Sequence, residues 1–419
     1  MQKTIKTVDV IYREDLYPRT ATNPEKVQEY AQNIEMLPPI EVNPQMILID
    51  GWHRWTAHKK NKLESINITI TETSSDADIK LLAAERNSQH GWQMSPSDKK
   101  DFARSTYHST PTNERKDVKK RLEKALSITG RTLNNWLSRI DKDSKKKQKD
   151  KIFDLWMSCH TQQEIAEAVG ISIDSVKKFK CEKENFPIST KYTFSESGYK
   201  PPIYDVWKKQ KKTNKVSHFG NSESQWLENL MYLYTDPFDV VVDPFAGGGS
   251  TIDVCKERGR RYFVSDRKPI VEREHEIKLH DIAESGLPKP PMWKDVKLVY
   301  LDPPYWKQAE NQYSKDPSDL ANMELELFNK TLSSLINKFS KKLQPGSYIA
   351  LIIQPTQWNS PGKVVVDHIL DMVNAVKLPV KKRYSVPYES QQCNAQMVVW
   401  AKENKETLVL TREIIVWEV

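Results

Sequence analysis

Several features are scarce in this chain of 419 residues, and each absence narrows its class. Only four cysteines are present and none forms a C-x-x-C pair, so the sequence predicts neither a zinc site nor a disulfide framework. No apolar run reaches the roughly 18 residues of a membrane span, and the first residues lack the apolar core of a signal peptide. We therefore expect a globular protein without a metal site, located in a reducing cytoplasm.

Positive charge is abundant and is concentrated in one region. The chain carries 64 Lys and Arg against 56 Asp and Glu, a formal net charge of +8. Residues 99–150 alone hold 16 basic against 7 acidic residues, an excess of nine. Such a local excess indicates a binding site for a polyanion. For the run 142–151 taken alone, a solvated linker is an equally good interpretation.

Changes of composition predict four zones. Residues 1–110 mix α and β patterns, and residues 111–182 look helical and basic. Residues 183–200 hold proline, glycine, Ser and Thr, which is typical of a linker. Residues 201–419 alternate apolar runs with helical patterns, which favours crossover units and a mainly parallel sheet. The predicted fold class is an α/β Rossmann-like C-terminal domain, preceded by an α+β domain and an all-α region.

Individual elements follow from local patterns. In the first zone we expect a short strand near residues 6–12, a helix at 24–34 and a strand at 46–50. In the last zone five runs are predicted as strands, namely FDVVVD, RRYFVSD, VKLVYLD, GSYIALIIQ and QMVVWAK.

A glycine-rich turn follows the first of these runs. FDVVVDPFAGGGST (residues 238–251) is a strand, an acidic residue, a glycine turn and a helix start. Glycines allow positive φ and a close approach of backbone to ligand, and the helix N-terminus offers free N–H groups. Ser250 or Thr251 is expected to cap that helix. A tight strand-to-helix turn is the alternative, and no lysine follows the glycines as in a phosphate loop.

Acidic residues recur after the next strands. RRYFVSD ends in Asp266, about twenty residues after the glycines, where a carboxylate suits ribose hydroxyls. Asp281 could accept a hydrogen bond from an adenine amino group, although a helix cap or a loop carboxylate is the better explanation for Asp281 taken alone. As a set, Asp243, Gly247, Gly249 and Asp266 predict a cofactor site.

A second motif ends the strand at residues 296–301, which leads into Asp302, Pro303, Pro304 and Tyr305. Ligands bind beyond the carboxyl ends of strands in open α/β sheets, so Asp302 is expected to face the glycine turn. Exocyclic amino nitrogens of bases are poor nucleophiles. Asp302 and the Pro303 carbonyl could accept hydrogen bonds from both N–H groups of such a nitrogen and so localise its lone pair. The prolines stiffen the loop, and Tyr305 offers a face to a flipped base. A proline-rich strand exit is the alternative.

Both motifs together resemble the amino-methyltransferase family that acts on DNA. The likeness covers roughly residues 200–400, and residues 218–239 resemble the helix that completes the family's cofactor pocket. It implies that Phe245 and Asp266 contact S-adenosylmethionine and that Asp302 to Tyr305 bind the target base. Asp at the first catalytic position is commoner in adenine-N6 enzymes, whereas Ser is frequent in cytosine-N4 enzymes.

One feature departs from that family. Only 35 residues separate Asp266 from Asp302, and the loop 307–322 is short, which leaves little room for a target-recognition segment. Sequence recognition is therefore expected from the N-terminal half.

Two stretches of that half, residues 49–60 and 85–100, point to a phosphate site. Gly51, His53 and Arg54 at a helix start could form an anion pocket, to which Asn87 and His90 would add. The stretches resemble the ParB/sulfiredoxin-like N-terminal domain, whose two motifs grip nucleotide phosphates. That family usually has Arg at the position of His90 and Glu-Arg at those of His53 and Arg54, so nucleotide hydrolysis is not implied. A scaffold that positions the following helices is the alternative.

Two helix-turn-helix candidates follow. The stronger spans residues 160–180, with Gly170 at the turn and Ser175, Lys177 and Lys178 among the residues facing the major groove. The weaker spans residues 122–140, and its exposed residues include Arg131, Asn134 and Asn135. ParB-like domains are commonly followed by such helices. An ordinary helical hairpin is the alternative for each.

These observations predict a ParB-like domain (1–110), a helix-turn-helix region (111–182), a linker (183–200) and a methyltransferase domain (201–419). The expected reaction is methyl transfer from S-adenosylmethionine to an exocyclic amino nitrogen of double-stranded DNA, adenine N6 in the first place. The setting would be a bacterial or phage-infected cell, and a homodimer stays open. The alternatives are a regulatory or partition protein with an inactive methyltransferase domain, a cytosine-N4 enzyme and an RNA guanine-N2 enzyme.

Overall fold

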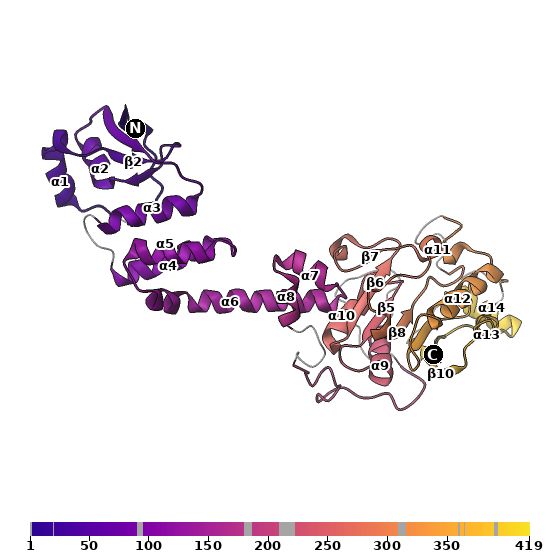
Figure 1. The fold of residues 1–419 in the computed structure, drawn as a ribbon. Coiled ribbons are helices and arrows are strands. Elements are labelled where there is room, and N and C mark those ends of the chain that lie inside the picture. Colours follow the sequence, from indigo (N-terminus) through magenta and orange to yellow (C-terminus); the bar gives the residue numbers. More distant parts are fainter. Residues whose placement is uncertain are drawn as a thin grey trace. The chain divides into compact units, whose positions relative to one another are not determined.

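The computed structural model describes residues 2–19, 21–89, 95–179, 187–208, 223–308, 316–358, 361–363, 365–388 and 393–419. The chain divides into two compact units, Met1–Lys147 and Gln148–Val419. The division falls inside the long helix α6 (Gly130–Met157), in the region 111–182 that we interpreted as helical and basic. Figure 1 labels the elements of both units, and within the described residues no helix combines the length and apolarity needed to cross a bilayer.

The first unit contains a four-stranded sheet with the order β1-β4-β2-β3. Its strands are β1 (Gln2–Lys6), β2 (Ile40–Val42), β3 (Leu48–Asp50) and β4 (Ser65–Ile70). Its first three helices are α1 (Pro24–Gln32), α2 (Trp52–Lys60) and α3 (Asp76–Gln89). The predicted helix at 24–34 and strand at 46–50 are confirmed to within two residues at each end.

The strand expected near residues 6–12 was placed too late. The observed strand β1 ends at Lys6, and a 3-10 turn, Thr7–Asp9, follows it. Thr7 binds across to the loop before β4, because its backbone N–H donates to the Glu64 carbonyl and its hydroxyl donates to the Leu63 carbonyl. These two bonds turn the chain out of the sheet.

Helices complete the first unit. The helix α4 (Pro96–Ser109), the helix α5 (Arg115–Leu126) and the first half of α6 pack with α3 around buried apolar side chains. The cluster is formed by Leu81, Ala84, Ala103, Tyr107, Val118, Leu122, Ala125, Leu126, Leu133 and Leu137. The helical character predicted for this stretch is therefore confirmed.

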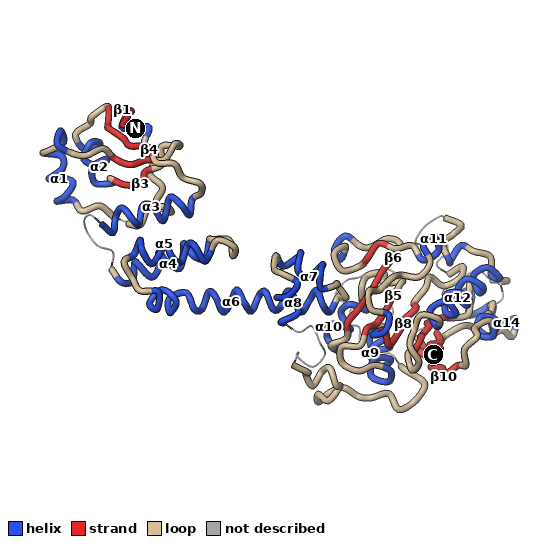
Figure 2. The backbone as a smooth tube through the Cα atoms, viewed as in Figure 1, coloured by secondary structure: helices blue, strands red, loops and turns tan. Residues whose placement is uncertain are grey.

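The second unit is built on a seven-stranded sheet with the order β10-β11-β9-β8-β5-β6-β7. The strands β5, β6, β8 and β10 of this sheet are labelled in Figure 2. Five strands run parallel: β5 (Val240–Asp243), β6 (Arg261–Asp266), β7 (Lys278–Leu279), β8 (Val296–Leu301) and β9 (Tyr348–Ile353). The strand β11 (Thr411–Glu418) is antiparallel to β9 and to β10 (Val380–Pro387). This is the mainly parallel sheet that the alternating pattern predicts.

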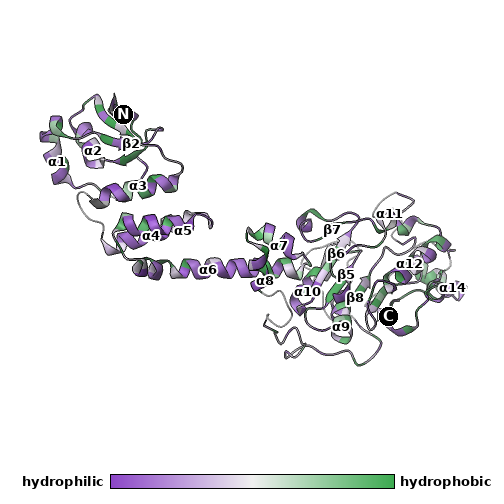
Figure 3. Cartoon of the chain, in the orientation of Figure 1, coloured by the Kyte–Doolittle hydropathy of each residue, from purple (hydrophilic) through white to green (hydrophobic). Residues whose placement is uncertain are grey.

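Both faces of this sheet are buried, as strands of a doubly covered sheet require. Val241 faces one apolar cluster, whereas its neighbours Val240 and Val242 face the other. The hydrophobic colour of the sheet strands in Figure 3 reflects this burial. The helices are α7 (Gln162–Val169), α8 (Ile173–Lys178), α9 (Ser224–Tyr234), α10 (Ser250–Arg258), α11 (Ile282–Ser285), α12 (Leu325–Ser340), α13 (Ile369–Asn374) and α14 (Ala395–Asn404).

One predicted strand is wrong. Four of the five apolar runs form strands of the sheet, but QMVVWAK lies in the helix α14. Asn394 caps this helix by accepting a hydrogen bond from the Met397 N–H at 2.9 Å, and Lys405 ends it in a left-handed conformation. A short apolar run does not distinguish strand from helix by periodicity alone, and here the cap decides.

Candidate active site and nucleic-acid surfaces

Three carboxylates gather at one edge of the second sheet. The central strand β5 lies between β6 and β8 and is parallel to both. Asp243 ends β5, Asp266 ends β6, and Asp302 directly follows β8. Because parallel strands present their carboxyl ends at one edge, the glycine turn and the loop that begins at Asp302 are neighbours there. The topology therefore meets the central requirement of the sequence hypothesis.

Asp243 is the most deeply buried of the three and organises the glycine turn. Its side chain accepts hydrogen bonds from the Phe245 N–H at 2.8 Å and from the Thr251 hydroxyl at 2.6 Å. Thr251 was expected to cap the helix α10, as was Ser250, but Gly249 occupies the cap position without a side-chain bond. The Thr251 hydroxyl instead ties the first turn of α10 to the end of β5.

Burial, with a smaller contribution from the charges of Asp302 and Asp266, raises the pKa of Asp243 to about 7, although the two hydrogen bonds that Asp243 accepts oppose this rise. A folded-state pKa above the ordinary value of 3.8 stabilises the fold below about pH 4. That contribution is lost as the pH rises through about 7, because the buried carboxyl must then ionise.

We therefore expect Asp243→Asn to flatten the fall in stability between pH 4 and pH 8, because the amide has no charge to acquire. The difference between variant and unaltered protein should reach a few kcal/mol (order of magnitude) in favour of the variant at pH 8. Thermal unfolding without cofactor at several pH values measures it. Asp174→Asn, on a side chain that is 81% exposed, is the control. Parallel stability curves for unaltered protein and Asp243→Asn would contradict this account.

Asp266 holds the glycine turn from the neighbouring strand. One carboxylate oxygen accepts from the Gly247 N–H at 2.9 Å and the other from the Lys268 N–H at 2.8 Å. Gly247 and Gly249 both have positive φ, at 49° and 78°. The turn therefore needs glycine at these two positions, as the sequence indicates.

Asp281 follows β7 and lies 3.2 Å from the guanidinium of Arg267. Arg267 also approaches Asp319 at 3.5 Å, so it links the end of β6 to the segment before α12. Sequence analysis missed Arg267, although its position directly after Asp266 was a signal. Phe245 is half-buried and packs against the apolar cluster on the α12 side, which Ile282 also joins.

The residues at this edge fit S-adenosylmethionine. Gly247 and Gly249 take the positive φ that shapes the turn, and at Gly249 the missing side chain lets Arg273 pack against the backbone. Asp266 and Asp281 are carboxylate acceptors at the ends of consecutive strands, suited to ribose hydroxyls and an adenine amino group. Phe245 supplies an aromatic side chain beside them.

The loop that carries the motif Asp302 to Tyr305 begins where β8 ends. The Tyr305 hydroxyl lies 3.3 Å from a carboxylate oxygen of Asp302, and Pro303 is buried between them, whereas Pro304 is half-buried. Asp302 and Tyr305 themselves are only partly buried. The loop thus presents a carboxylate, a rigid carbonyl and an aromatic ring together.

Two residues near this loop were missed by sequence analysis. The guanidinium of Arg412 lies 5.5 Å from the centre of the Tyr305 ring, and its Nε donates to the Tyr388 hydroxyl at 2.7 Å. Tyr388 in turn donates to Gln354 at 2.7 Å. Arg412 and Tyr388 are distant from Asp302 in sequence, and no motif marks them.

In the first unit, Gly51 takes φ 103° at the start of α2, where a side chain would clash with Ile40. His53 accepts a hydrogen bond from the Asn23 N–H at 2.9 Å; burial lowers the pKa of its ring, and the charges of Arg19 and Lys26 add to this.

The other candidate phosphate-binding side chains also have partners inside the protein. Arg54 pairs with Asp50 at 2.7 Å, and the Asn87 amide donates to the Ala83 carbonyl at 2.7 Å. His90 lies outside the described residues.

The helices α5 and α6 form the first helix-turn-helix arrangement. Ser127 turns the chain after α5 in a left-handed conformation, and Gly130 begins α6. Arg131, Asn134 and Asn135 are exposed on α6, and Asn134 accepts a hydrogen bond from Lys119 at 3.2 Å.

A row of lysines runs along the exposed face of α5. Lys116, Lys120 and Lys124 are spaced by four residues, so they lie on one side of the helix. All three are exposed, and no ion-pair partner is found for them among the described residues. We call these three residues the α5 lysine row.

The helices α7 and α8 form the second arrangement, as the pattern at 160–180 predicts. Gly170 makes the turn with φ 71°, and the second helix is shorter than expected, since Lys178 is its last residue and Lys180 lies outside the described residues. Ser175 takes part in the cap with Ser172, and Lys177 lies 3.4 Å from Asp174. Lys177 and Lys178 are exposed.

This second pair belongs to the catalytic unit. The ring of Trp156, near the end of α6, lies 5.3 Å from that of Phe238, and its carbonyl accepts from Arg261 at 3.3 Å. Phe238 precedes β5 and Arg261 begins β6, so the end of α6 packs at the amino edge of the sheet, opposite the carboxylates. Ile165 and Val176 join the same apolar cluster.

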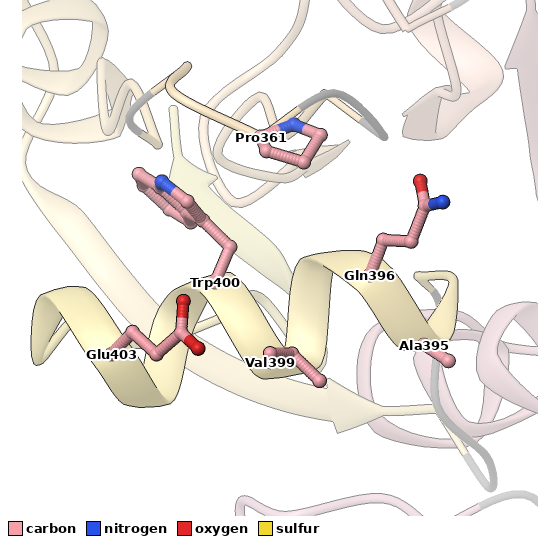
Figure 4. Close-up of a pocket in the computed structure, with 6 residues that line it drawn as sticks. All are labelled: Pro361, Ala395, Gln396, Val399, Trp400 and Glu403. Atoms are coloured by element: carbon pink, nitrogen blue, oxygen red, sulfur yellow. The ribbon is translucent and has the colours of Figure 1, made fainter.

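A surface hollow of about 400 Å³ lies over α14 (Figure 4). It contains none of the predicted site residues and is lined by Pro361, Ala395, Gln396, Val399, Trp400 and Glu403. Among the described residues there is also no group of three or more His, Cys, Asp or Glu side chains arranged to hold a metal ion.

Comparison with known families gives two matches. The sequence model of the DNA methylase family matches residues 53–273, just over half of the chain. That range contains the glycine turn and Asp266 and ends before Asp302. The model of the ParB N-terminal domain matches residues 2–86.

Comparison with solved structures gives weak likenesses. C-terminally truncated ParB from Caulobacter crescentus complexed with CTP-gamma-S is 14% identical; the match covers 42% of this chain and 98% of that one, with a TM-score of 0.20. A SAM-dependent methyltransferase from Archaeoglobus fulgidus is 15% identical, with 47% and 94% covered and a TM-score of 0.29. TM-scores this low carry no argument by themselves, and a search of curated proteins finds no match.

The length of the family match and the two motif loops at one edge of the sheet lead to the same conclusion. This chain belongs to the DNA methylase family and is a DNA amino-methyltransferase that uses S-adenosylmethionine, joined to a ParB-like N-terminal domain.

Proposed function

We propose that this enzyme methylates N6 of adenine at specific sites in double-stranded DNA. The observation that carries the proposal is the sequence Asp302-Pro303-Pro304-Tyr305, which follows β8 beside the glycine turn. The family comparison covers both adenine-N6 and cytosine-N4 enzymes. Asp in place of Ser at the first catalytic position favours adenine.

The chemistry follows from what these residues offer. Bound S-adenosylmethionine supplies an electrophilic methyl group on a sulfonium. Asp302 and the carbonyl of Pro303 each accept a hydrogen bond from one N–H group of the target amino nitrogen. These two hydrogen bonds localise the nitrogen lone pair, which then points toward the methyl group. Tyr305 stacks on the flipped base, and the main contribution of the site is proximity and alignment.

The proposed division of labour follows the predicted zones. Residues 1–110 form a ParB-like platform, and residues 111–182 hold duplex DNA. Residues 183–200 connect this DNA-holding region to residues 201–419, which carry out the methyl transfer. The first helix pair is the better candidate for the main duplex contact, because the α5 lysine row accompanies Arg131 and Asn134. Ser175, Lys177 and Lys178 of α8 form a second proposed contact. A homodimer and a phosphate site around Gly51, His53, Arg54, Asn87 and His90 also remain proposals.

The DNA-binding part predicts a salt-dependent effect. Replacing the α5 lysine row by glutamine should weaken binding to duplex DNA. It should also reduce the slope of log K against log salt by up to about 2.7, roughly 0.9 for each lost phosphate contact. Fluorescence anisotropy at several salt concentrations measures both quantities.

The matched control removes the same charge from the catalytic unit. Lys338, Lys341 and Lys342 at the end of α12 are also exposed, and their replacement by glutamine should leave the slope unchanged. Equal slopes for both triple variants would assign the duplex contact elsewhere, and Lys177→Gln with Lys178→Gln then tests α8.

The reaction itself is tested by incubating the full chain with radiolabelled S-adenosylmethionine and unmethylated genomic DNA, followed by nucleoside analysis. Label in N6-methyladenine is the expected result. Label in N4-methylcytosine would refute the choice of base. Label only in a parallel RNA sample would refute DNA as substrate. DNA binding without any transfer would favour a regulatory protein with an inactive domain.

A further inference from the structure

Arg412 is a half-buried cation with aromatic rings around it, at the carboxyl edge of the parallel strands. It lies near the start of β11, whose antiparallel pairing with β9 brings this end of the strand to the carboxyl edge of the parallel strands. Its guanidinium is 4.6 Å from the centre of the Tyr388 ring, 5.3 Å from Trp226 and 5.5 Å from Tyr305. Three aromatic side chains from separate segments thus converge on one charge.

This arrangement fixes the orientation of the guanidinium. The Nε atom donates to the Tyr388 hydroxyl at 2.7 Å, and Tyr388 donates to Gln354 at 2.7 Å. Gln354, directly after β9, is only 5% exposed. A planar guanidinium can interact with ring faces in a way that a lysine ammonium does not reproduce.

Arg412 also acts on Asp302 electrostatically. Burial opposes its charge, but the oxygens of Tyr305, Tyr388 and Asp302 outweigh burial and raise the pKa of the guanidinium. In the same way, the positive charge of Arg412 favours the ionised form of the Asp302 carboxyl group.

We propose that Arg412 is a positioning residue for methyl transfer: held over the Tyr305 ring, it fixes the ring on which the target base rests and places a positive charge near Asp302. The inference rests on the proposed function, because it assumes that Asp302 and Tyr305 bind the base. It adds a residue of β11, which lies about 110 residues after Asp302 in the sequence, to the residues needed for methyl transfer.

The other charged and titratable groups near Asp302 do not substitute for Arg412. Asp243 on β5 carries no positive charge, and it repels a negative charge only once it is itself ionised. Tyr300 on β8 is buried, and burial raises its pKa well above the ordinary value, so it stays neutral. Tyr305 donates a hydrogen bond without carrying charge. Among these groups Arg412 is the one that supplies positive charge.

Two substitutions separate charge from shape. Arg412→Met removes the charge at similar length. We expect kcat/KM for DNA methylation to fall at least about tenfold at pH 7, and the acid limb of its pH profile to move up by about one unit. Arg412→Lys restores the charge without the planar guanidinium. It should return the acid limb to its original position while kcat stays reduced.

Controls separate this role from a general loss of structure. Arg383→Met removes a cation from the adjacent strand β10, where Arg383 pairs with Glu413, and should leave the pH profile unchanged. The affinity for S-adenosylmethionine, measured by calorimetry, should stay within about twofold in all variants, because the bonds of Asp243 and Asp266 that organise the glycine turn are unchanged. Tyr388→Phe removes the bond that orients Arg412, together with the bond from Tyr388 to Gln354, and should lower kcat without moving the acid limb.

Two results would overturn the inference: unaltered turnover and acid limb in Arg412→Met, or an equal shift of the limb in Arg412→Lys. If Arg412→Met does not fold, the variants Arg412→Lys and Tyr388→Phe test the inference, because each keeps a cation at this position. A normal kcat in both variants would reject the positioning role of Arg412. Absence of methyl transfer by the unaltered chain would instead reject the proposed function, and the role of Arg412 with it.

Discussion

Replacing Asp302 by alanine should reduce kcat for DNA methylation by about a thousandfold, the upper range for loss of one preorganised polar group in an active site. The carboxylate accepts a hydrogen bond from the target amino group and so localises the lone pair of the nitrogen. The neighbouring Pro303 carbonyl cannot replace it, because this carbonyl accepts a hydrogen bond from only one of the two N–H groups. Methyl transfer from labelled cofactor under single-turnover conditions measures the loss. Binding of S-adenosylmethionine should persist, because Asp243 and Asp266 organise the glycine turn without Asp302.

The matched control uses the other end of the same strand. Asp295 directly precedes β8 at the amino edge of the sheet and pairs with Arg261 at 3.3 Å. Asp295→Asn should therefore leave kcat within about twofold of the unaltered enzyme while changing the same kind of side chain. Persistent transfer in Asp302→Ala, or equal losses in the two variants, would show that Asp302 does not bind the reacting group.

Local sequence patterns predicted that the two motif loops meet at one edge of the sheet, because these loops follow the neighbouring strands β5 and β8. A buried apolar run followed by an acidic residue or by glycines indicates where a parallel strand ends, and β5, β6 and β8 end at such residues. Once the sheet is parallel, Asp243, Asp266 and Asp302 must share an edge. The sequence pattern predicted the positions of the carboxylates but not their hydrogen-bond partners. Thr251, for example, was expected to cap α10, but its hydroxyl donates to Asp243 instead.

Contacts made by the antiparallel part of the sheet could not be predicted in the same way. Arg412 reaches Tyr305 only because β11 pairs with β9, and no short pattern relates residues about 110 positions apart. The helix α14 illustrates the same difficulty locally, because its apolar run MVVWA is compatible with a strand until the cap at Asn394 is considered. Sequence therefore predicted the loops that follow the parallel strands, and tertiary packing supplied the residues around them.

Substitution of Gly249 by alanine should weaken S-adenosylmethionine binding at least about tenfold, equivalent to about 1.4 kcal/mol. Gly249 has φ 78°, and a Cβ atom there would lie 2.7 Å from Cδ of Arg273. Arg273 cannot move aside easily, because it is 9% exposed and its guanidinium binds both carboxylate oxygens of Asp253 at 2.8 Å. The turn itself must therefore shift, and the cofactor site with it.

Gly346 separates this clash from the cost of the backbone conformation. It also has φ 78°, but the nearest atom to its Cβ would be the Lys297 ammonium at 3.7 Å. Gly346→Ala should therefore lose only about 1–2 kcal/mol of stability to the left-handed conformation and should bind the cofactor normally. Calorimetric titration of both variants, together with thermal unfolding, distinguishes the two effects. Equal cofactor affinities would mean that the glycine turn does not hold S-adenosylmethionine, since only the Gly249 variant places a side chain against the locked Arg273.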